Sequence, residues 1–178
     1  MITRLVLRTA LAVLLAATAA DAKTAAPPWG GPVGRWLQPS RDAGARVALQ
    51  EWRKAKNFSS CRPFAFASYG RAGAGAVPRR AVFSGGWGVA WDLPGKRSAF
   101  GIAGAGIDGS DADTRRWPHR IAWSDGSAAG YGPEGGTGPT VLAYLHVDTQ
   151  TCLYNVWSNL GEAHLVQLLG SLRYVPVA

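Results

Sequence analysis

The sequence predicts an α+β fold in which an antiparallel sheet of about five to six strands carries an N-terminal and a C-terminal helix, as a two-layer sandwich with one disulfide. Runs typical of strands, separated by turn residues, fill the middle of the chain. Apolar residues at helical spacing lie on either side of them. The 178 residues are 47% hydrophobic and 17% charged, which favours one packed domain over a disordered chain.

Residues 1–22 have the pattern of a secretory signal peptide. Arg4 and Arg8 precede a short apolar run, and Ala20-Asp21-Ala22 fits the small-x-small pattern of a cleavage site. The run is shorter than the ~20 residues that a spanning helix needs. We therefore expect an exported chain that is periplasmic or secreted and does not span the membrane.

The mature chain is expected to begin with an arm. Residues 23–39 are rich in Pro and Gly, with Trp29 and Trp36 available to attach the arm to a single α+β domain over 40–178. Ser40 is the predicted N-cap of an amphipathic helix over 41–56.

Two segments after the predicted first helix have the pattern of strands. Residues 62–69 have the composition of a strand, and the runs within 81–106 meet at Pro94-Gly95, which favours a hairpin. A two-residue loop would place Trp91 opposite Ser98 and Asp92 opposite Arg97.

The two faces of this hairpin differ in bulk. One is aromatic and branched, and the other consists of Gly and Ala, among them Gly88 and Gly101. A bare strip allows a helix or a ligand to approach the backbone closely. We expect a helix to cover it.

Residues 107–138 are predicted to be mostly loop, with a short strand at 120–124 and a surface loop at 131–136. A second hairpin is predicted to follow them. With Thr149-Gln150 at its turn, the hairpin of 140–158 has a core face that includes Cys152. Its opposite face would carry six further side chains: Leu142, Tyr144, His146, Leu153, Asn155 and Trp157.

The last helix has the clearest pattern. Asn159 and Glu162 have the spacing of a capping box, and leucines follow at 165, 168, 169 and 172. His164 would flank this helix or lie in its first turn. A short strand at 173–175 is expected to end the fold.

Cys61 and Cys152 are the only cysteines, so a disulfide-dense miniprotein and a four-thiolate zinc site are excluded. In an oxidising compartment we expect the two to form a disulfide. Closing a loop of this size would stabilise the fold by roughly 4–5 kcal/mol.

Positive charge is concentrated in one third of the chain. The sequence has 19 Lys and Arg against 11 Asp and Glu, a formal charge of +8. Between Arg35 and Arg80 only Asp42 and Glu51 oppose the basic residues. Either the composition is simply biased towards Arg, or this region meets an acidic partner, of which nucleic acid is the least expected because the chain is exported.

Two sets of residues are candidates for a site. The predicted binding residues are Arg115, Arg116, Trp117, His119 and Arg120, because Arg and Trp are enriched at binding hot spots. The weaker catalytic candidates are His146, Tyr144 and Asn155, which could transfer a proton.

The chain shows no pattern for a cofactor or a metal. Asp108, Asp111 and Asp113 could offer carboxylates to Ca²⁺, but they lack the EF-hand spacing and Arg115 and Arg116 compete for them. The sequence therefore predicts an exported, non-catalytic binding protein of the cell envelope, with a protein or an anionic glycan as ligand. The alternative is an envelope hydrolase that uses His146, Tyr144 and Asn155.

Overall fold

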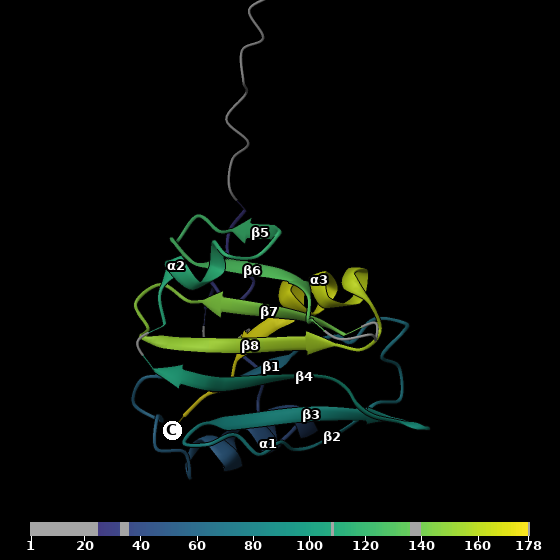
Figure 1. Ribbon diagram of the computed structural model, residues 1–178. Helices are drawn as coiled ribbons and strands as arrows, with labels where there is room; N and C mark the ends of the chain where they lie inside the picture. Colours follow the sequence, from purple (N-terminus) through teal and green to yellow (C-terminus); the bar gives the residue numbers. More distant parts are fainter. Residues whose placement is uncertain (1–24, 33–35, 108, 136–139, 178) are drawn as a thin grey trace, which may run out of the picture.

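An antiparallel sheet of seven strands dominates the computed structural model, which describes residues 25–32, 36–107, 109–135 and 140–177. The predicted signal peptide lies outside these residues. The sheet order is β2-β3-β4-β8-β7-β6-β5 (Figure 1). Its strands are β2 (Val77–Arg80), β3 (Trp87–Leu93), β4 (Lys96–Ile107), β5 (His119–Ala122), β6 (Ala128–Pro133), β7 (Val141–His146) and β8 (Cys152–Ser158).

A second sheet joins the two ends of the domain. β1 (Phe64–Phe66) pairs antiparallel with β9 (Leu172–Tyr174), with Ala65 opposite Arg173. The helices are α1 (Ala43–Trp52), α2 (Asp111–Thr114) and α3 (Glu162–Ser171). The predicted α+β class and antiparallel sheet are confirmed, but the main sheet has more strands than expected. The strand predicted at 62–69 is the short β1, outside the main sheet.

The core lies on one face of the main sheet, beneath α1, α3 and the β1–β9 pair (Figure 1). Its largest fully buried side chains are Trp87, Trp91, Tyr154, Phe64, Phe66, Phe100, Ile102, Leu145, Leu165, Leu168, Leu169 and Leu172. The four leucines at helical spacing after Glu162 are therefore core residues, as predicted.

Helix α1 begins later and ends earlier than predicted. Its N-cap is Asp42, whose carboxylate accepts a hydrogen bond from the Ala45 amide at 2.7 Å, so the N-cap predicted at Ser40 is wrong. Gly44 allows the helix to approach β3, because a Cβ at that position would lie 2.6 Å from Cζ2 of Trp91.

The β3–β4 hairpin turns at Pro94-Gly95 as predicted, but its register differs by two residues. Trp91 lies opposite Phe100 rather than Ser98, because a bulge follows Trp91 and Ser98 adopts a positive φ of 49°. The Asp92 carboxylate holds the bulge by accepting from the Ser98 amide at 2.7 Å. Asp92 lies at the bulge rather than opposite Arg97 as predicted, and its carboxylate forms an ion pair with Arg79 of β2 at 2.8 Å. A shift of two residues leaves the two faces unchanged.

The β7–β8 hairpin matches its predicted register throughout. Leu142 lies opposite Trp157, Tyr144 opposite Asn155 and His146 opposite Leu153. The loop predicted at 131–136 is wrong in part, because 131–133 belong to strand β6. Gly130 of β6 has the Thr114 carbonyl directly above it, so a bare backbone lets α2 lie against the strand.

Helix α3 begins at a different cap from the one predicted. Its N-cap is Gly161, with a φ of 95°, and Asn159 instead donates to the Ser98 carbonyl at 2.9 Å. His164 does lie in the first turn, but it is buried. Its Nε2 lies 3.0 Å from the Tyr69 carbonyl, and its Nδ1 lies 2.9 Å from Oγ of Ser158.

The predicted disulfide between Cys61 and Cys152 is present. It connects the segment before β1 to the first residue of β8. It thus joins the main sheet to the layer formed by α1, α3 and the β1–β9 pair, here called the covering layer. In the arm, Trp29 is buried and its ring packs 4.9 Å from that of Trp123. None of the helices in the described part of the chain is long and apolar enough to cross a membrane.

Candidate functional site on the open face of the sheet

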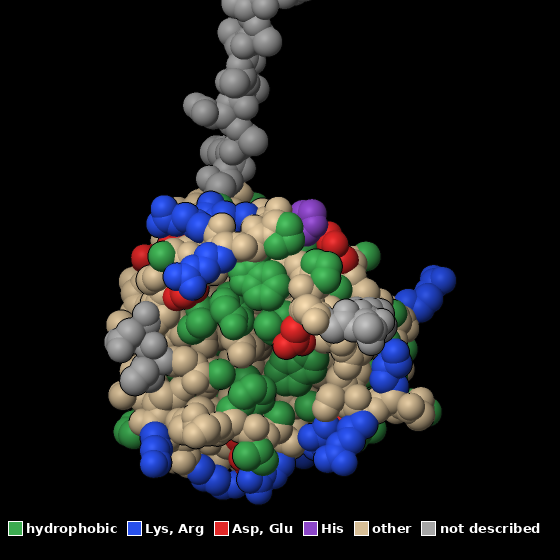
Figure 2. Space-filling model, in the orientation of Figure 1, with side chains coloured by type: hydrophobic (Ala, Val, Ile, Leu, Met, Phe, Trp, Pro, Cys, Tyr) green, Lys and Arg blue, Asp and Glu red, His purple; other side chains and the backbone are tan. Residues whose placement is uncertain are grey.

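The face of the main sheet opposite α1 and α3, here called the open face, carries half-buried side chains in a row. From β7 and β8 it receives the six side chains predicted to share a face: Leu142, Tyr144, His146, Leu153, Asn155 and Trp157. Figure 2 shows hydrophobic side chains gathered at the centre of this face, with Lys and Arg along its upper and lower margins. An apolar centre with basic margins is therefore turned towards solvent.

Aromatic rings cover the bare glycine strip of the β3–β4 hairpin, so the helix expected there is wrong. The Trp157 ring lies directly over Gly101, and the Phe83 ring lies over Gly88, where a Cβ would be 2.7 Å from Cδ2 of Phe83. The two ring centroids are 6.0 Å apart. The missing side chains of Gly88 and Gly101 let both rings lie close to the backbone.

A groove of about 320 Å³ crosses the open face at these rings. It is lined by Phe83, Glu134, Thr140, Leu142, Asn155, Trp157 and Asn159. Trp157 thus covers Gly101 and also faces the groove. Phe83 lies in the loop between β2 and β3, and Glu134 directly follows β6, so the groove is assembled from segments far apart in the sequence.

The polar residues of the groove differ in whether they are already paired. Asn159 is held by Ser98 and accepts from the Thr140 hydroxyl at 2.6 Å. Asn155 makes no side-chain hydrogen bond with any described residue, and Glu134 has neither a hydrogen bond nor an ion pair through its carboxylate within the same ranges. Asn155 and Glu134 are therefore available to a ligand.

The three catalytic candidates lie on the open face, but no hydrogen bond links them to one another. Tyr144 and Asn155 are direct cross-strand neighbours, and His146 is two residues further along β7, opposite Leu153. Nδ1 of His146 is buried without a partner in the described structure. The Trp117 ring packs edge-on against Tyr144, with centroids 5.3 Å apart. Of the three, Asn155 alone lines the groove.

The predicted basic loop borders the open face beyond Tyr144. Arg115 and Arg120 both reach the carboxylate of Asp111, at 3.0 and 2.7 Å. The hydrogen bond from Arg120 is the main reason that the pKa of Asp111 lies below its ordinary value, and a second bond from Thr114 adds to it. Much of the positive charge of these two arginines is therefore balanced locally.

The remaining predicted binding residues differ in exposure. Arg116 is exposed and pairs with none of the described acidic side chains, whereas Trp117 is half-buried against Tyr144. The ring of His119 packs 5.3 Å from that of Tyr131, and its Nε2 lies 3.9 Å from Glu162. The loop thus offers one unpaired cation at the margin rather than a separate pocket.

The structure gives no support to a calcium site within the ranges it covers. Asp111 is occupied by arginines, and Asp113 accepts from the Ser110 amide at 3.2 Å. Asp108 lies outside the described residues. No group of three or more His, Cys, Asp or Glu side chains suited to a metal is found among those described.

Phe83, Glu134 and Asn159 were not singled out as site residues by the sequence. The apolar pair Val82-Phe83, next to the glycines at 85 and 86, was the one available signal, because large apolar residues in a loop are typical of interaction surfaces.

The chain was compared with protein-family models, with curated proteins and with solved structures, and none of these comparisons gave a match.

Proposed function

We propose that the protein is an exported, non-catalytic binding protein of the cell envelope and that its open face binds an anionic glycan. The observation that carries this proposal is the position of Trp157. Its ring lies over the bare backbone of Gly101 and faces a groove that also contains Asn155 and Glu134, whose side chains pair with no described residue.

This combination suits a sugar better than a wholly apolar ligand. A sugar ring presents an apolar C–H face that can pack on an indole, with hydroxyl groups around its edge. The carboxamide of Asn155 can donate to and accept from hydroxyl groups, and the carboxylate of Glu134 accepts only. An aromatic surface with a few polar groups around it is the usual composition of a small-ligand site.

The charge of the chain favours an acidic glycan over a neutral one. The sequence carries a formal charge of +8, and Lys and Arg border the open face above and below (Figure 2). Such a field attracts an anionic chain and raises the rate at which it is captured. The single carboxylate of the groove, Glu134, would then meet hydroxyl groups rather than the acidic groups of the ligand.

The proposal is tested by isothermal titration calorimetry with a short oligogalacturonate as the acidic glycan. We expect Trp157→Ala to weaken binding about tenfold or more, because stacking on an aromatic ring is lost. Asn155→Ala should weaken it several-fold while leaving Gly101 covered. Trp36→Ala is the matched control, since Trp36 packs against Tyr174 in the covering layer and should leave affinity unchanged.

Two results would contradict the proposal. One is that neither Trp157→Ala nor Asn155→Ala changes the affinity of a folded protein. The other is that the wild-type protein binds no oligogalacturonate but instead captures a protein through the same aromatic residues, which would assign the open face to a protein partner.

A hydrolase that acts through His146, Tyr144 and Asn155 remains the second candidate. The observation in its favour is the unpartnered Nδ1 of His146 on the same face as the Tyr144–Asn155 pair. Incubation with oligogalacturonate followed by mass spectrometry distinguishes the two functions. Shortened products that disappear in His146→Ala would favour the hydrolase, and an intact ligand favours binding alone.

A further inference from the structure

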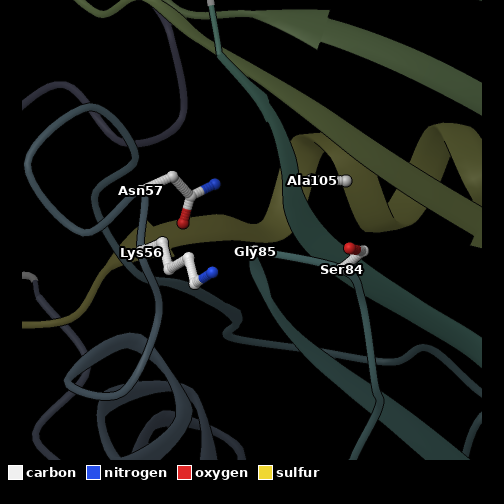
Figure 3. Close-up of a pocket in the computed structure, with 5 residues that line it drawn as sticks. All are labelled: Lys56, Asn57, Ser84, Gly85 and Ala105. Atoms are coloured by element: carbon white, nitrogen blue, oxygen red, sulfur yellow. The ribbon is translucent and has the colours of Figure 1, made fainter.

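A second, smaller cleft lies on the other side of the loop that carries Phe83. It has a volume of about 270 Å³ and is lined by Lys56, Asn57, Ser84, Gly85 and Ala105. Figure 3 shows Lys56 and Asn57 on one side of it, and Ser84, Gly85 and Ala105 on the other. The backbone N–H of Asn57 donates to the Gly85 carbonyl at 3.2 Å, which fixes the loop of Phe83 against the segment after α1.

Asn57 presents an unused acceptor in this cleft. The residue is 7% exposed, and its Nδ2 donates to the Gly104 carbonyl at 2.8 Å. Because that carbonyl can only accept, the carboxamide orientation is fixed and Oδ1 must point the other way. Oδ1 is buried and has no partner in the described structure. A buried acceptor left unpaired is costly, so a ligand that donates a hydrogen bond there gains affinity.

Lys56 supplies a cation at the same cleft. It is exposed and pairs with no carboxylate of the described chain. Its neighbours Lys54 and Arg80 both reach Glu51, at 3.0 and 3.7 Å. Ser84 is also exposed, and its hydroxyl makes no hydrogen bond within those ranges. The cleft therefore combines a positive charge, a hydroxyl and a buried acceptor, none of which is paired with another described residue.

The pairing of a cation with a buried acceptor selects among anionic ligands. An ionised sulfate group can satisfy Lys56, but it carries no proton to donate to Oδ1 of Asn57. A sugar acid carries both a carboxylate and neighbouring hydroxyl groups. The volume is near the lower end of ligand pockets, about 300 Å³, which suits one sugar residue.

We infer that the cleft of Lys56, Asn57 and Ser84 binds one uronic acid residue of the glycan, with the carboxylate on Lys56 and a hydroxyl donating to Oδ1 of Asn57. This inference rests on the proposed glycan-binding function and names the sugar class. The cleft and the groove lie near each other, because a third hollow shares Phe83 with the groove and shares Lys56 and Gly85 with the cleft. A glycan stacked on Trp157 would thus have the cleft of Lys56 nearby.

The first test removes the charge of Lys56. In titrations with oligogalacturonate we expect Lys56→Gln to weaken binding about tenfold, as for the loss of a charge-assisted hydrogen bond. Arg71→Gln is the control, because it removes one positive charge from an exposed residue that lines none of the three hollows, and it should cost less than about twofold. Methyl-esterified oligogalacturonate should bind wild type and Lys56→Gln equally. An equal loss in Lys56→Gln and Arg71→Gln, or no loss in either, would overturn the inference.

The second test uses monomeric galacturonate and follows the side-chain N–H signals of Asn57 by NMR. We expect galacturonate to shift these signals, and galactose or inorganic sulfate to leave them in place. If galacturonate does not shift them while Trp157→Ala still abolishes oligogalacturonate binding, the uronate cleft is wrong and the glycan-binding function stands. If galacturonate shifts them but wild type does not bind the oligomer, the cleft stands and the proposed function is wrong.

Discussion

His164 is the titratable side chain most fully enclosed by the α3 packing. It is 4% exposed, lies between Ser158 and the Tyr69 carbonyl, and packs against Phe100. Because a carbonyl only accepts, Nε2 carries the proton and Nδ1 accepts from the Ser158 hydroxyl. Burial lowers the pKa of His164 below its ordinary value of 6.5.

This pKa shift predicts a pH dependence of stability. The unfolded chain binds the proton more readily than the folded one, so the contribution of His164 is complete above pH 6.5 and is lost as the pH falls below it. We expect the free energy of unfolding in urea to decline between about pH 7 and pH 5. His164→Gln, which keeps a donor for Tyr69, should flatten this decline.

Asp92 and Asp111 affect stability in a lower pH range than His164, so they do not obscure the effect of His164 on the free energy of unfolding. The bonds from Arg79 to Asp92 and from Arg120 to Asp111 lower the pKa of each acid below its ordinary value of 3.8. The stability they contribute is lost only as the pH falls below that value. An unchanged slope in His164→Gln between pH 7 and 5 would contradict the role given to His164.

Helix α1 lies against β3 at a glycine. A methyl group at Gly44 would come within 2.6 Å of the Trp91 ring, which is fully buried and stacked on Phe100. Gly170 of α3, in contrast, is exposed and has nothing within 4 Å of its Cβ position. The two glycines therefore form a matched pair, one required by packing and one not.

We expect Gly44→Ala to destabilise the fold by about 2 kcal/mol, because the helix must move off the sheet. Gly170→Ala should stabilise it by up to about 1 kcal/mol, since alanine is the better helix former. Urea unfolding monitored by circular dichroism measures both. A Gly44→Ala variant as stable as wild type would show that α1 is not held at this distance from β3.

The elements that could be predicted were those with a strict local pattern. The β7–β8 hairpin alternates buried and half-buried residues along both strands, so its register followed from the sequence. The β3–β4 register did not, because the bulge depends on the Asp92 carboxylate reaching the Ser98 amide. β6 was read as part of a loop because Gly130 and Gly132 resemble turn residues, whereas they permit close contact with α2 and Pro118.

The same distinction applies to the candidate site. Tyr144, Asn155 and Trp157 could be placed on one face because they alternate along paired strands. Phe83, Glu134 and Asn57 come from loops or from turns after a helix, and only the folded chain brings them beside the sheet. The covering role of Phe83 and Trp157 was missed because the bare glycine strip suits a helix equally well.

At the scale of the whole molecule, the two faces of the sheet have different roles. The disulfide between Cys61 and Cys152 ties the covering layer to β8, and the core lies between them. The opposite face keeps its apolar centre in contact with solvent, with basic residues above and below (Figure 2). The central claim is that a glycan binds this open face at Trp157.

The eight tryptophans of the chain allow that claim to be tested in a single measurement. Each indole N–H gives its own signal in a ¹H–¹⁵N NMR spectrum, assigned by single Trp substitutions. On titration with oligogalacturonate, the account predicts that the Trp157 signal shifts and broadens. The signals of Trp29 and Trp36, which pack against Trp123 and Tyr174 respectively, should stay in place. Shifts of the Trp29 or Trp36 signal while the Trp157 signal stays in place would contradict glycan binding at the open face.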